Sequence, residues 1–415
     1  MRLHKFLHNS FTNIRSLGAV ASLALLSGCS WQSLLGLDGK QSTFITEGPV
    51  ARTQLDLFYV TCYVTFAIFV IVASILAYAT IKFKARTPAE ESAIPPEEGH
   101  GNPLIEVGLI AASVFALVII AVPTLKGIWY TYDVPVEEKA NAYEITATGY
   151  QWWFKFEYLN EQVPGAGVLT TGNELVVPAG RPIHVNLRSM DVMHSFWIPK
   201  LAGKVDMIPN RGNLLWFKAD KPGYFWGQCA EFCGDSHALM RFRVIALSPR
   251  DFNDWLDQQS KSYRVVASTG SGLGKAQFAS LRSFKENEPG VSGDFEVSPL
   301  DAWKAKQFPE KNENPELITR GMHLFSEKTC NTCHMIRGYA GAVGVAGPEL
   351  THVGSRTTIA GGNLDNNAEQ LQRWIHNPGA VKPGNKMWVN GYLLNNIKLT
   401  SEDEVALVAF LQSLK

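Results

Sequence analysis

Two long stretches without charged residues dominate the pattern of hydrophobic and polar positions in the first third of the chain. Leu57–Ile81 and Val107–Leu125 contain no charged residue, and each is close to the roughly 20 residues needed to span a bilayer core. They predict a transmembrane helical hairpin over residues 57–126. Three basic residues follow the first stretch: Lys82, Lys84 and Arg86. By the positive-inside bias they place the intervening loop in the cytoplasm and everything after the second helix on the outer face.

After residue 126 the pattern changes to short alternating segments bounded by Gly and Pro. Four such segments read as strands or strand pairs: residues 142–158, 173–189, 213–229 and 240–247. Several short strands within about a hundred residues are typical of a sandwich or a Greek-key barrel. We therefore predict an all-β domain over residues 127–250.

The pattern becomes helical again toward the end of the chain. Residues 251–316 are predicted to be a helix and a linker, because a short helix at 248–260 gives way to a stretch rich in Ser, Gly, Lys and Glu, with a partial helix at 299–307. Residues 317–415 are predicted to form a small all-α domain, on helical spacing in three segments: 317–328, 367–377 and 401–414. In the last segment, Ser401 followed by Glu404 predicts a capping box.

The first residues have the pattern of an exported protein. Arg2 and Lys5 precede the apolar stretch "LGAVASLALLSGC", which is typical of a secretory signal ending in small residues. The ending "LLSGC" resembles the bacterial lipobox, so we predict a signal peptide over 1–28, a lipid on Cys29 and an N-terminal segment over 29–56. The alternative is an unlipidated cysteine beside an ordinary cleavage site.

Composition and charge add one exclusion. Lys plus Arg and Asp plus Glu both number 38, so the formal net charge is zero, and hydrophobic residues make up 46% of the chain. A balanced charge does not indicate nucleic-acid binding. The partners of this chain must therefore be inferred from its sites and its membrane segments.

A short stretch of the β domain is dense in soft metal ligands. "GQCAEFCGDSHALM" contains Cys229, Cys233, His237 and Met240, and "DVMHSF" supplies His194. In an exported protein two cysteines four residues apart could form a disulfide, and Cys2His2 zinc is a formal alternative. Two imidazoles and a thioether beside the cysteines suit copper better. A mononuclear blue-copper site needs one thiolate, so the second cysteine indicates a copper pair that transfers electrons.

A second motif lies in the predicted α domain. Cys330, Cys333 and His334 form a C-x-x-C-H pattern, in which two cysteines attach c-type haem and the histidine binds its iron. A redox dithiol or half of a zinc site are the alternatives for C-x-x-C alone. Methionine as sixth ligand raises the haem potential. Met335 cannot reach around the ring, so we predict Met387, which follows a Pro-Gly loop.

Three segments together resemble subunit II of the haem-copper cytochrome c oxidases: "GYQWWFKFEY", "DVMHSFWIPKLAGKVDMIPNR" and "PGYFWGQCAEFCGDSHALM". The last hundred residues, with "GPELTHVGSRTTIAGG" and "KPGNKM", resemble the cytochrome c domain fused to subunit II in caa-type oxidases. The resemblance implies a cupredoxin-like β domain and a dinuclear copper centre, CuA. Its implied ligands are the side chains of His194, Cys229, Cys233, His237 and Met240 and the carbonyl of Glu231. It also implies magnesium, shared with subunit I, on the Glu231 carboxylate.

The resemblance assigns roles to two further residues. Trp152 matches the aromatic residue at which electrons enter CuA, whereas we assign Trp153 to packing. Glu106 matches a glutamate at the entrance of a proton pathway into subunit I. Here this chain departs from the family, because Leu109, Ile110 and Ser113 replace the usual Trp-Thr and Pro. In the haem domain, Met387 is followed by Trp388 where the family commonly has Pro.

The predicted function is that of an electron-input subunit of a respiratory terminal oxidase in the bacterial inner membrane, with both soluble domains on the periplasmic face. Electrons would pass from an external donor, such as a cytochrome c or a quinol-oxidising complex, through haem c and CuA to subunit I, coupled to proton translocation; subunit III is a further expected partner. The oxygen-reducing site lies in another chain, because neither span contains a histidine.

A quinol oxidase subunit would lack the copper ligands, and a nitrous oxide reductase would need a further large β domain. A membrane-tethered copper and haem carrier outside any oxidase remains the alternative.

Overall fold

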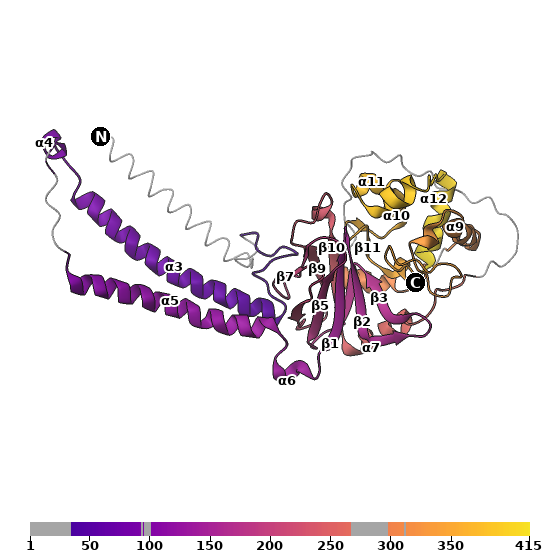
Figure 1. Cartoon of the computed structure of the whole chain (residues 1–415), viewed down its shortest axis with the longest axis horizontal. Coiled ribbons are helices and arrows are strands. Elements are labelled where there is room, and N and C mark those ends of the chain that lie inside the picture. Colours follow the sequence, from indigo (N-terminus) through magenta and orange to yellow (C-terminus); the bar gives the residue numbers. More distant parts are fainter. Residues whose placement is uncertain (1–34, 93, 95–100, 267–297, 311–312) are drawn as a thin grey trace, which may run out of the picture.

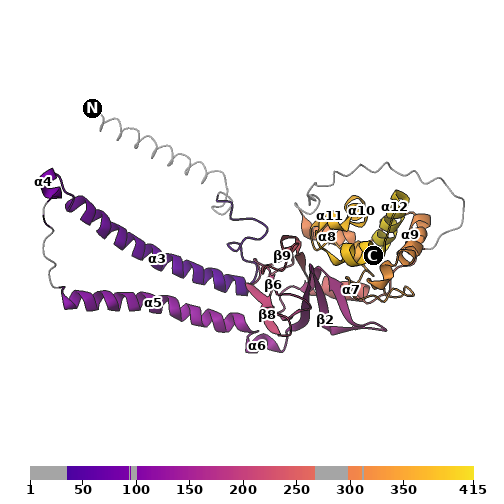
Figure 2. The same cartoon turned by 45° about the horizontal axis from the view of Figure 1, so that its top comes forward.

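The computed structural model describes residues 35–92, 94, 101–266, 298–310 and 313–415. The predicted signal peptide and Cys29 lie outside these residues. Two long helices, α3 (Pro49–Lys82) and α5 (Pro103–Tyr132), form a hairpin that projects away from the other domains (Figure 1). The one-turn helix α4 (Pro88–Glu91) lies at its tip, and the two long helices stay side by side in a second view (Figure 2). Both are long and apolar enough to cross a membrane.

Each long helix continues beyond its uncharged stretch toward the next domain. At these inner ends Val50, Ala51 and Gly127 are buried, and the Ala51 backbone amide donates to the carbonyl oxygen of Leu201 at 3.2 Å. A short helix, α6 (Val136–Lys139), then leads into the first strand. The hairpin is therefore anchored to the rest of the chain by packing as well as by its connections.

The second part, which we call the β domain, is a sandwich of two five-stranded sheets with strand orders β3-β2-β1-β5-β8 and β4-β10-β9-β6-β7. Each sheet contains one parallel pair, β1 with β5 and β10 with β4, as in a Greek-key arrangement. The predicted all-β domain is confirmed. The strands are β1 (Tyr143–Tyr150), β2 (Trp153–Val163), β3 (Gly167–Gly172), β4 (Glu174–Pro178), β5 (Ile183–Ser189), β6 (His194–Trp197), β7 (Lys204–Met207), β8 (Asn213–Phe217), β9 (Gly223–Cys229) and β10 (Arg241–Leu247).

Aromatic side chains fill the space between the two sheets. Phe154 and Phe156 of β2 face Phe196 of β6 and Phe242 of β10, and all four are fully buried. The rings of Phe196 and Phe242 stack at a centroid distance of 4.6 Å, and Phe154 meets Phe242 edge-on at 4.8 Å. These contacts join β6, which begins with the predicted ligand His194, to β10, which begins directly after the predicted ligand Met240.

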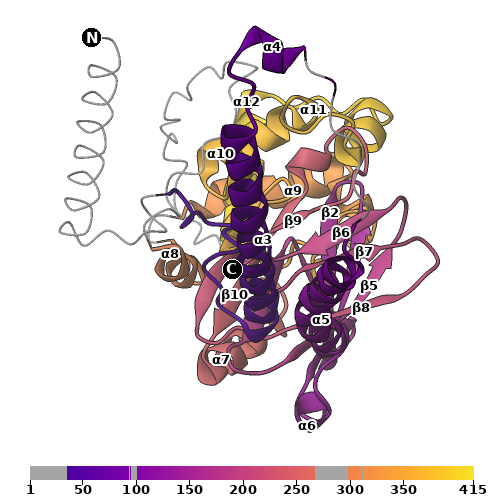
Figure 3. The same ribbon diagram turned by 90° about the vertical axis from the view of Figure 1, so that its left-hand side faces the viewer.

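The third part, the helical domain, follows α7 (Pro249–Gln259) and α8 (Pro299–Lys306). Its main helices are α9 (Pro315–Glu327), α10 (Ala368–His376), α11 (Pro378–Val381), a π-helical turn at Met387–Leu393 and α12 (Ser401–Ser413), with a two-stranded ladder of β11 (Thr358–Ile359) and β12 (Leu364–Asp365). The predicted all-α domain is confirmed. Figure 3 views the molecule from the tip of the hairpin, with both other domains behind it.

The capping box predicted for the last helix was placed one residue too late. Thr400 is the N-cap: its hydroxyl accepts from the Asp403 amide at 3.2 Å, and the Asp403 carboxylate accepts from the Thr400 amide at 3.1 Å. Glu404 is buried instead, where it accepts hydrogen bonds from His376 at 2.7 Å and Gln372 at 3.0 Å. Because the Glu404 side chain is bonded to α10, it does not cap the start of α12.

Candidate functional site

The five predicted copper-binding side chains converge at one end of the β domain; we call them the thiolate cluster. The Sγ atoms of Cys229 and Cys233 lie 3.8 Å apart, well beyond the roughly 2.05 Å of a disulfide bond, and both cysteines are free. Cys229 Sγ lies 3.9 Å from His194 Nδ1 and 3.3 Å from the Glu231 carbonyl oxygen. Cys233 Sγ lies 3.6 Å from His237 Nδ1 and 3.9 Å from Met240 Sδ.

Strand pairing brings these residues together from two segments. His194 begins β6 and Cys229 ends β9, and the pairing of Phe196 with Cys229 sets the two strands in register. The other members lie on the β9–β10 loop, which ends where β10 begins at Arg241. Gly149 lies against the His194 ring, where a Cβ atom would come within 2.7 Å of Cδ2. The absence of a side chain at Gly149 therefore makes room for the imidazole.

Asp191 fixes the orientation of the His194 imidazole. Its Oδ1 lies 2.8 Å from His194 Nε2, which leaves Nδ1 to face Cys229. Burial alone would raise the pKa of Asp191, but hydrogen bonds from His194 and from the backbone amides of Gln151 and Val192 lower it below its usual range. A carboxylate that holds the second ring nitrogen of a histidine is a common support for a metal ligand.

The two thiols do not share charge equally. The close Cys233 sulfur, together with His194 and the Glu231 carbonyl, lowers the pKa of the Cys229 thiol. The same contact raises the pKa of Cys233, since two adjacent thiolates repel each other. The two buried sulfurs lie side by side, with an imidazole on the outer side of each. The donor set therefore fits a copper pair.

Trp152 connects the thiolate cluster to the surface of the β domain. Its Nε1–H donates to the Cys233 carbonyl oxygen at 2.9 Å, and the Gln151 side-chain amide donates to the same oxygen through Nε2 at 2.9 Å. The indole is only 6% exposed. Trp152 thus contacts the backbone of a predicted copper ligand, at the position predicted for electron transfer into the cluster.

Two predicted acidic sites lie elsewhere. The Glu231 carboxylate points away from the sulfurs, with its Oε2 3.8 Å from Lys204 Nζ, while its carbonyl faces Cys229. Glu106 lies exposed in the first turn of α5, behind the N-cap Asn102. The first turn of α5 lies at the hairpin tip, the end of this helix that is farther from the β domain (Figure 1).

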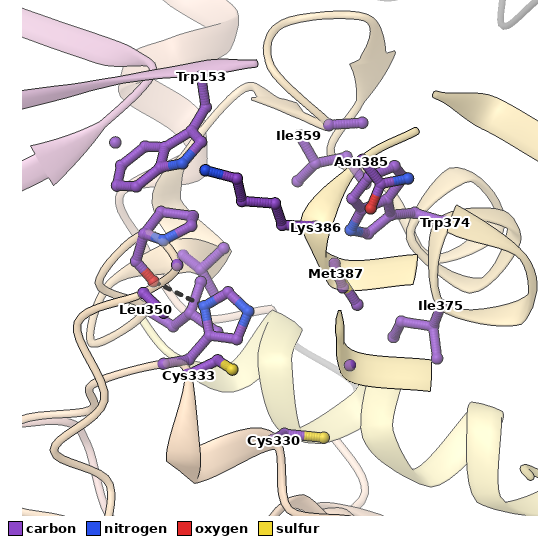
Figure 4. A pocket seen from close by; sticks show the side chains of 18 of the residues that line it. Trp153, Cys330, Cys333, Leu350, Ile359, Trp374, Ile375, Asn385, Lys386 and Met387 are labelled. Atoms are coloured by element: carbon purple, nitrogen blue, oxygen red, sulfur yellow. Dashed lines mark hydrogen bonds between the residues drawn. The ribbon is translucent and has the colours of Figure 1, made fainter. Parts of the chain in front are cut away.

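A cavity of about 260 Å³ opens in the helical domain around the C-x-x-C-H motif (Figure 4). Cys330, Cys333, His334 and Met387 all line it. His334 Nδ1 lies 2.8 Å from the Pro348 carbonyl oxygen, so its Nε2 is free for an iron atom. Burial lowers the pKa of His334, which keeps the imidazole neutral. Aliphatic and aromatic side chains complete the wall: Leu350, Val353, Ile359, Leu371, Trp374, Ile375, Leu407 and Leu411.

Two buried cations also line the cavity. Lys382 Nζ donates to the carbonyl oxygens of Trp152 and Ala360, and Arg356 Nη2 donates to that of Glu349. Burial lowers the pKa of both groups, that of Lys382 to about 7. Their hydrogen-bond partners are carbonyl oxygens, although the nearby carboxylates of Glu349 and Glu174 partly offset the effect of burial on Arg356. An anion in the cavity would stabilise the charged form of both groups further. A flat apolar group with carboxylates, such as haem, fits this lining.

Sequence reasoning missed that the β domain forms part of this cavity. Four residues of the β domain line it: Trp152, Trp153, Gly172 and Asn173. Figure 4 shows the Trp153 side chain next to that of Lys386 from the helical domain. Trp153, which we assigned to packing, stacks on Tyr150 at 4.6 Å and also faces the cavity. The two adjacent tryptophans in "WW" were the one available signal that this strand contacts another part of the protein. Which of the two rings faces the helical domain depends on how the domains dock.

Comparison with known proteins assigns a family to each of the two domains that hold these sites. A family model described as "Cytochrome C oxidase subunit II, periplasmic domain" matches residues 161–247, and one described as "Cytochrome c" matches residues 318–415. Cytochrome c oxidase subunit 2 of Alkalihalophilus pseudofirmus is 32% identical over 393 residues, which cover 94% of each chain. This chain belongs to the cytochrome c oxidase subunit 2 family.

Other relatives differ in how much of the chain they cover. Cytochrome c oxidase subunit 2 of Bacillus subtilis is 28% identical over 407 residues and again covers 94% of each chain. Quinol oxidase subunit 2 of Bacillus cereus is 29% identical over 288 residues, which cover 69% of this chain and 89% of that one. Among solved structures, the periplasmic domain of subunit II of cytochrome oxidase of Bradyrhizobium japonicum is 34% identical, covers 28% of this chain and 92% of that one, and has a TM-score of 0.26.

Family membership settles the coarser expectations. The matched subunit II domain and cytochrome c domain imply CuA and haem c as cofactors and an electron-input role in a haem-copper oxidase, in association with its subunit I. The two apolar helices fit a membrane-anchored subunit with its β domain on the outer face. The resemblance predicted from the sequence is thereby confirmed.

Proposed function

We propose that this chain carries electrons from an external donor, through haem c in the helical domain and CuA in the β domain, to the oxygen-reducing subunit I, coupled to proton translocation. The observation that carries the proposal is the position of Trp152. Trp152 lines the haem cavity, and its Nε1–H donates to the Cys233 carbonyl of the thiolate cluster. One residue therefore contacts both predicted redox sites.

In this proposal the thiolate cluster binds the copper pair. Cys229, Cys233, His194, His237 and Met240 would hold the two ions with their side chains, and Glu231 would add its backbone carbonyl. When bound, a pair of this kind shares one electron over two ions and so needs little rearrangement on reduction. Asp191 keeps the His194 tautomer fixed, and burial of the sulfurs excludes water.

The helical domain would hold the haem. Cys330 and Cys333 would attach it covalently, and His334 and Met387 would bind its iron. Pro348 orients His334 through the Nδ1 hydrogen bond. We assign the haem carboxylates to the buried cations Arg356 and Lys382, because these two groups line an otherwise largely apolar cavity.

Two carboxylates serve the partner subunit. Glu231, whose carbonyl faces the sulfurs, would place its carboxylate on a magnesium ion shared with subunit I, since that hard cation prefers oxygen ligands. Glu106 would lie at the entrance of a proton pathway. The helix from Glu106 to Tyr132 is about 39 Å long at 1.5 Å per residue, so Glu106 reaches the cytoplasmic side when the β domain lies on the outer face.

The remaining assignments concern the N-terminus, the further partners and the bounds of the domains. Removal of residues 1–28 and lipidation of Cys29 would add a second membrane anchor, and subunit III would join the complex. The immediate donor would be a cytochrome c or a quinol-oxidising complex. The segments 29–56, 57–126, 127–250, 251–316 and 317–415 would then act as anchor, membrane hairpin, CuA domain, linker and haem domain.

Metal and haem analysis of the full chain tests this function. We expect two copper ions with one shared unpaired electron and one covalent low-spin haem, by elemental analysis and electron paramagnetic resonance. Cys229→Ser should abolish the paired-copper signal, whereas Cys62→Ser, in the membrane helix α3, should leave it unchanged. Zinc, a single copper or no covalent haem would refute the cofactor assignment.

Assembly with subunit I separates the two candidate functions. An oxidase subunit should support oxygen uptake with an external donor, and the Cys229→Ser variant should not. A chain that binds both cofactors yet never supports oxygen uptake with subunit I would favour the tethered carrier. The oxidase is preferred because family members over nearly the full length are oxidase subunits.

A further inference from the structure

A buried carboxylate joins the two soluble domains. Glu174, the first residue of β4, is 4% exposed. Its Oε1 accepts hydrogen bonds from the backbone amides of Thr357 at 2.7 Å and Thr358 at 3.3 Å, and from the Thr357 hydroxyl. Its Oε2 accepts from Trp303 Nε1 of α8 at 3.1 Å. Every one of these donors lies beyond the β domain, in the helical domain or in the helix that precedes it.

Glu174 has a physical reason to bind these donors. Burial raises the pKa of its carboxyl group, and the hydrogen bonds from Thr357 and Trp303 oppose that shift. A buried carboxylate is costly unless donors surround it. Because its donors belong to the other part of the chain, the carboxylate is satisfied in the docked arrangement, and separation of the domains would leave water to replace them.

The segment that Glu174 binds is also a wall of the haem cavity. Thr358, Ile359, Ala360 and Gly361 line the cavity, and the segment makes further bonds to β9 and β10. The Tyr224 hydroxyl lies 2.7 Å from Thr357 Oγ1. Two arginines complete the contact: Arg241 donates its amide to the Gly361 carbonyl at 2.8 Å, and Arg243 donates Nη2 to the Gly362 carbonyl at 3.0 Å.

The residues just before Glu174 face the same cavity from the β domain. Gly172 and Asn173 line it together with Trp152 and Trp153. The Asn173 side chain accepts from the Phe154 amide at 2.9 Å, which ties this turn to β2. A single stretch, residues 172–174, therefore forms part of the cavity wall and also holds the opposite wall through Glu174.

We propose that Glu174 is a positioning residue that holds the helical domain on the β domain, so that the haem cavity faces Trp152 and Trp153 during electron transfer. The proposal rests on the proposed function, because it specifies the geometry in which haem c would reduce CuA. Glu174 touches neither cofactor site, and it acts through Thr357, Thr358 and Trp303.

The test uses the full chain assembled with subunit I. Glu174→Gln keeps the size of the side chain but removes its charge and replaces one acceptor with a donor. Glu157→Gln is the matched control, since Glu157 lies on β2 of the same domain and pairs with Lys155 of its own strand at 2.9 Å. Thr357→Val removes the hydroxyl from the other side of the contact and serves if the Glu174 variant fails to fold.

Two measurements apply to each variant. Hydrogen exchange of residues 172–176 and 357–363 reports docking, and the rate of CuA reduction after rapid haem c reduction reports electron transfer. For Glu174→Gln we expect exchange in both segments to rise and the rate to fall by about tenfold or more, as for loss of a charged hydrogen bond. Copper and haem spectra should stay unchanged. Thr357→Val should act in the same direction, and the double variant should be less than additive because both changes remove one contact.

The outcomes distinguish the positioning role from the proposed function. Unchanged exchange in Glu174→Gln and Thr357→Val would overturn the docking contact, and raised exchange with an unchanged rate would overturn the positioning role. An equal effect in Glu157→Gln would also overturn the proposal. If the unaltered chain did not transfer electrons from haem c to CuA, the proposed function would fail, yet the exchange result would still decide whether Glu174 holds the domains together.

Discussion

Adding one methyl group at Gly384 should separate haem c from CuA without touching a ligand. Gly384 has a φ of 73° and lies on the loop between Lys382 and Met387. A Cβ atom here would lie 3.0 Å from Trp152 Cη2 and 3.3 Å from Asp235 Oδ2. The preceding residue, Pro383, accepts a hydrogen bond from Ser236 Oγ at 2.6 Å. Gly384→Ala therefore crowds the contact between the two domains at the Trp152 ring.

The size of the effect follows from these distances. Contacts of 3.0–3.3 Å require the neighbours to move by a few tenths of an ångström, and overpacking of this kind costs about 1–3 kcal/mol. The cost falls on the docked state, because the undocked loop is free of Trp152. We therefore expect the docking equilibrium to weaken about 5- to 150-fold. The positive φ adds about 1–2 kcal/mol of strain within the helical domain itself.

A matched glycine separates strain from crowding. Gly341 has a similar φ of 81°, and the nearest atom to its Cβ would be Asn331 Nδ2 at 3.6 Å, within the helical domain. Both alanine variants should lower the thermal stability of the helical domain. The rate of CuA reduction by haem c should fall in Gly384→Ala and stay unchanged in Gly341→Ala. Equal rates in the two variants would refute the inferred route past Trp152.

Three further changes probe the haem ligand, the β core and a buried histidine. Met387→His should keep the haem low-spin but lower its midpoint potential, because thioether ligation raises it; an unchanged potential in a redox titration would exclude Met387 as a ligand. Phe242→Ala should destabilise the β domain by about 3–5 kcal/mol, whereas Phe308→Ala, at a side chain 65% exposed, should cost little; denaturant unfolding compares them, and equal losses would contradict the assigned core. Burial lowers the pKa of His352, so the unfolded chain binds more protons below about pH 6.5 and stability should fall with acidification. His352→Gln should flatten that fall in pH-dependent unfolding, and an unaltered slope would rule out His352 as its source.

The sequence was informative where local pattern decides structure. Alternation and turn residues placed β1, β2, β4, β5, β8, β9 and β10, which lie within the four predicted segments. β3, β6 and β7 lie outside those segments and were missed. β3 pairs with β2, and β6 pairs with β7 and with β9, so pairing partners rather than local propensity stabilise these three strands. The capping box failed for the same reason, since Glu404 binds His376 and Gln372.

The ligand residues could be identified from spacing and resemblance, but their support could not. Cys229 and Cys233 are four residues apart in the chain, so their meeting needs little beyond a loop. Asp191 was passed over because its role depends on the angle at which β6 begins. Glu174 carried a signal: it is a charged residue at the start of the apolar strand "ELVVP", all of which is buried. A charge there predicts a buried partner, although the sequence does not say that the partner is another domain.

The docked arrangement explains why a tether alone is insufficient for fast electron transfer. A covalent link raises the effective concentration of one domain at the other to about millimolar, but a link alone does not set the orientation of the haem. Orientation comes from contacts at separate places: Lys382 on the Trp152 carbonyl, Ser236 on the Pro383 carbonyl and Glu174 on Thr357. A typical hydrogen bond contributes about 1 kcal/mol, so each contact supplies only part of the docking free energy. Loss of one contact should slow electron transfer in part, whereas loss of all three should leave a rate set by the tether alone.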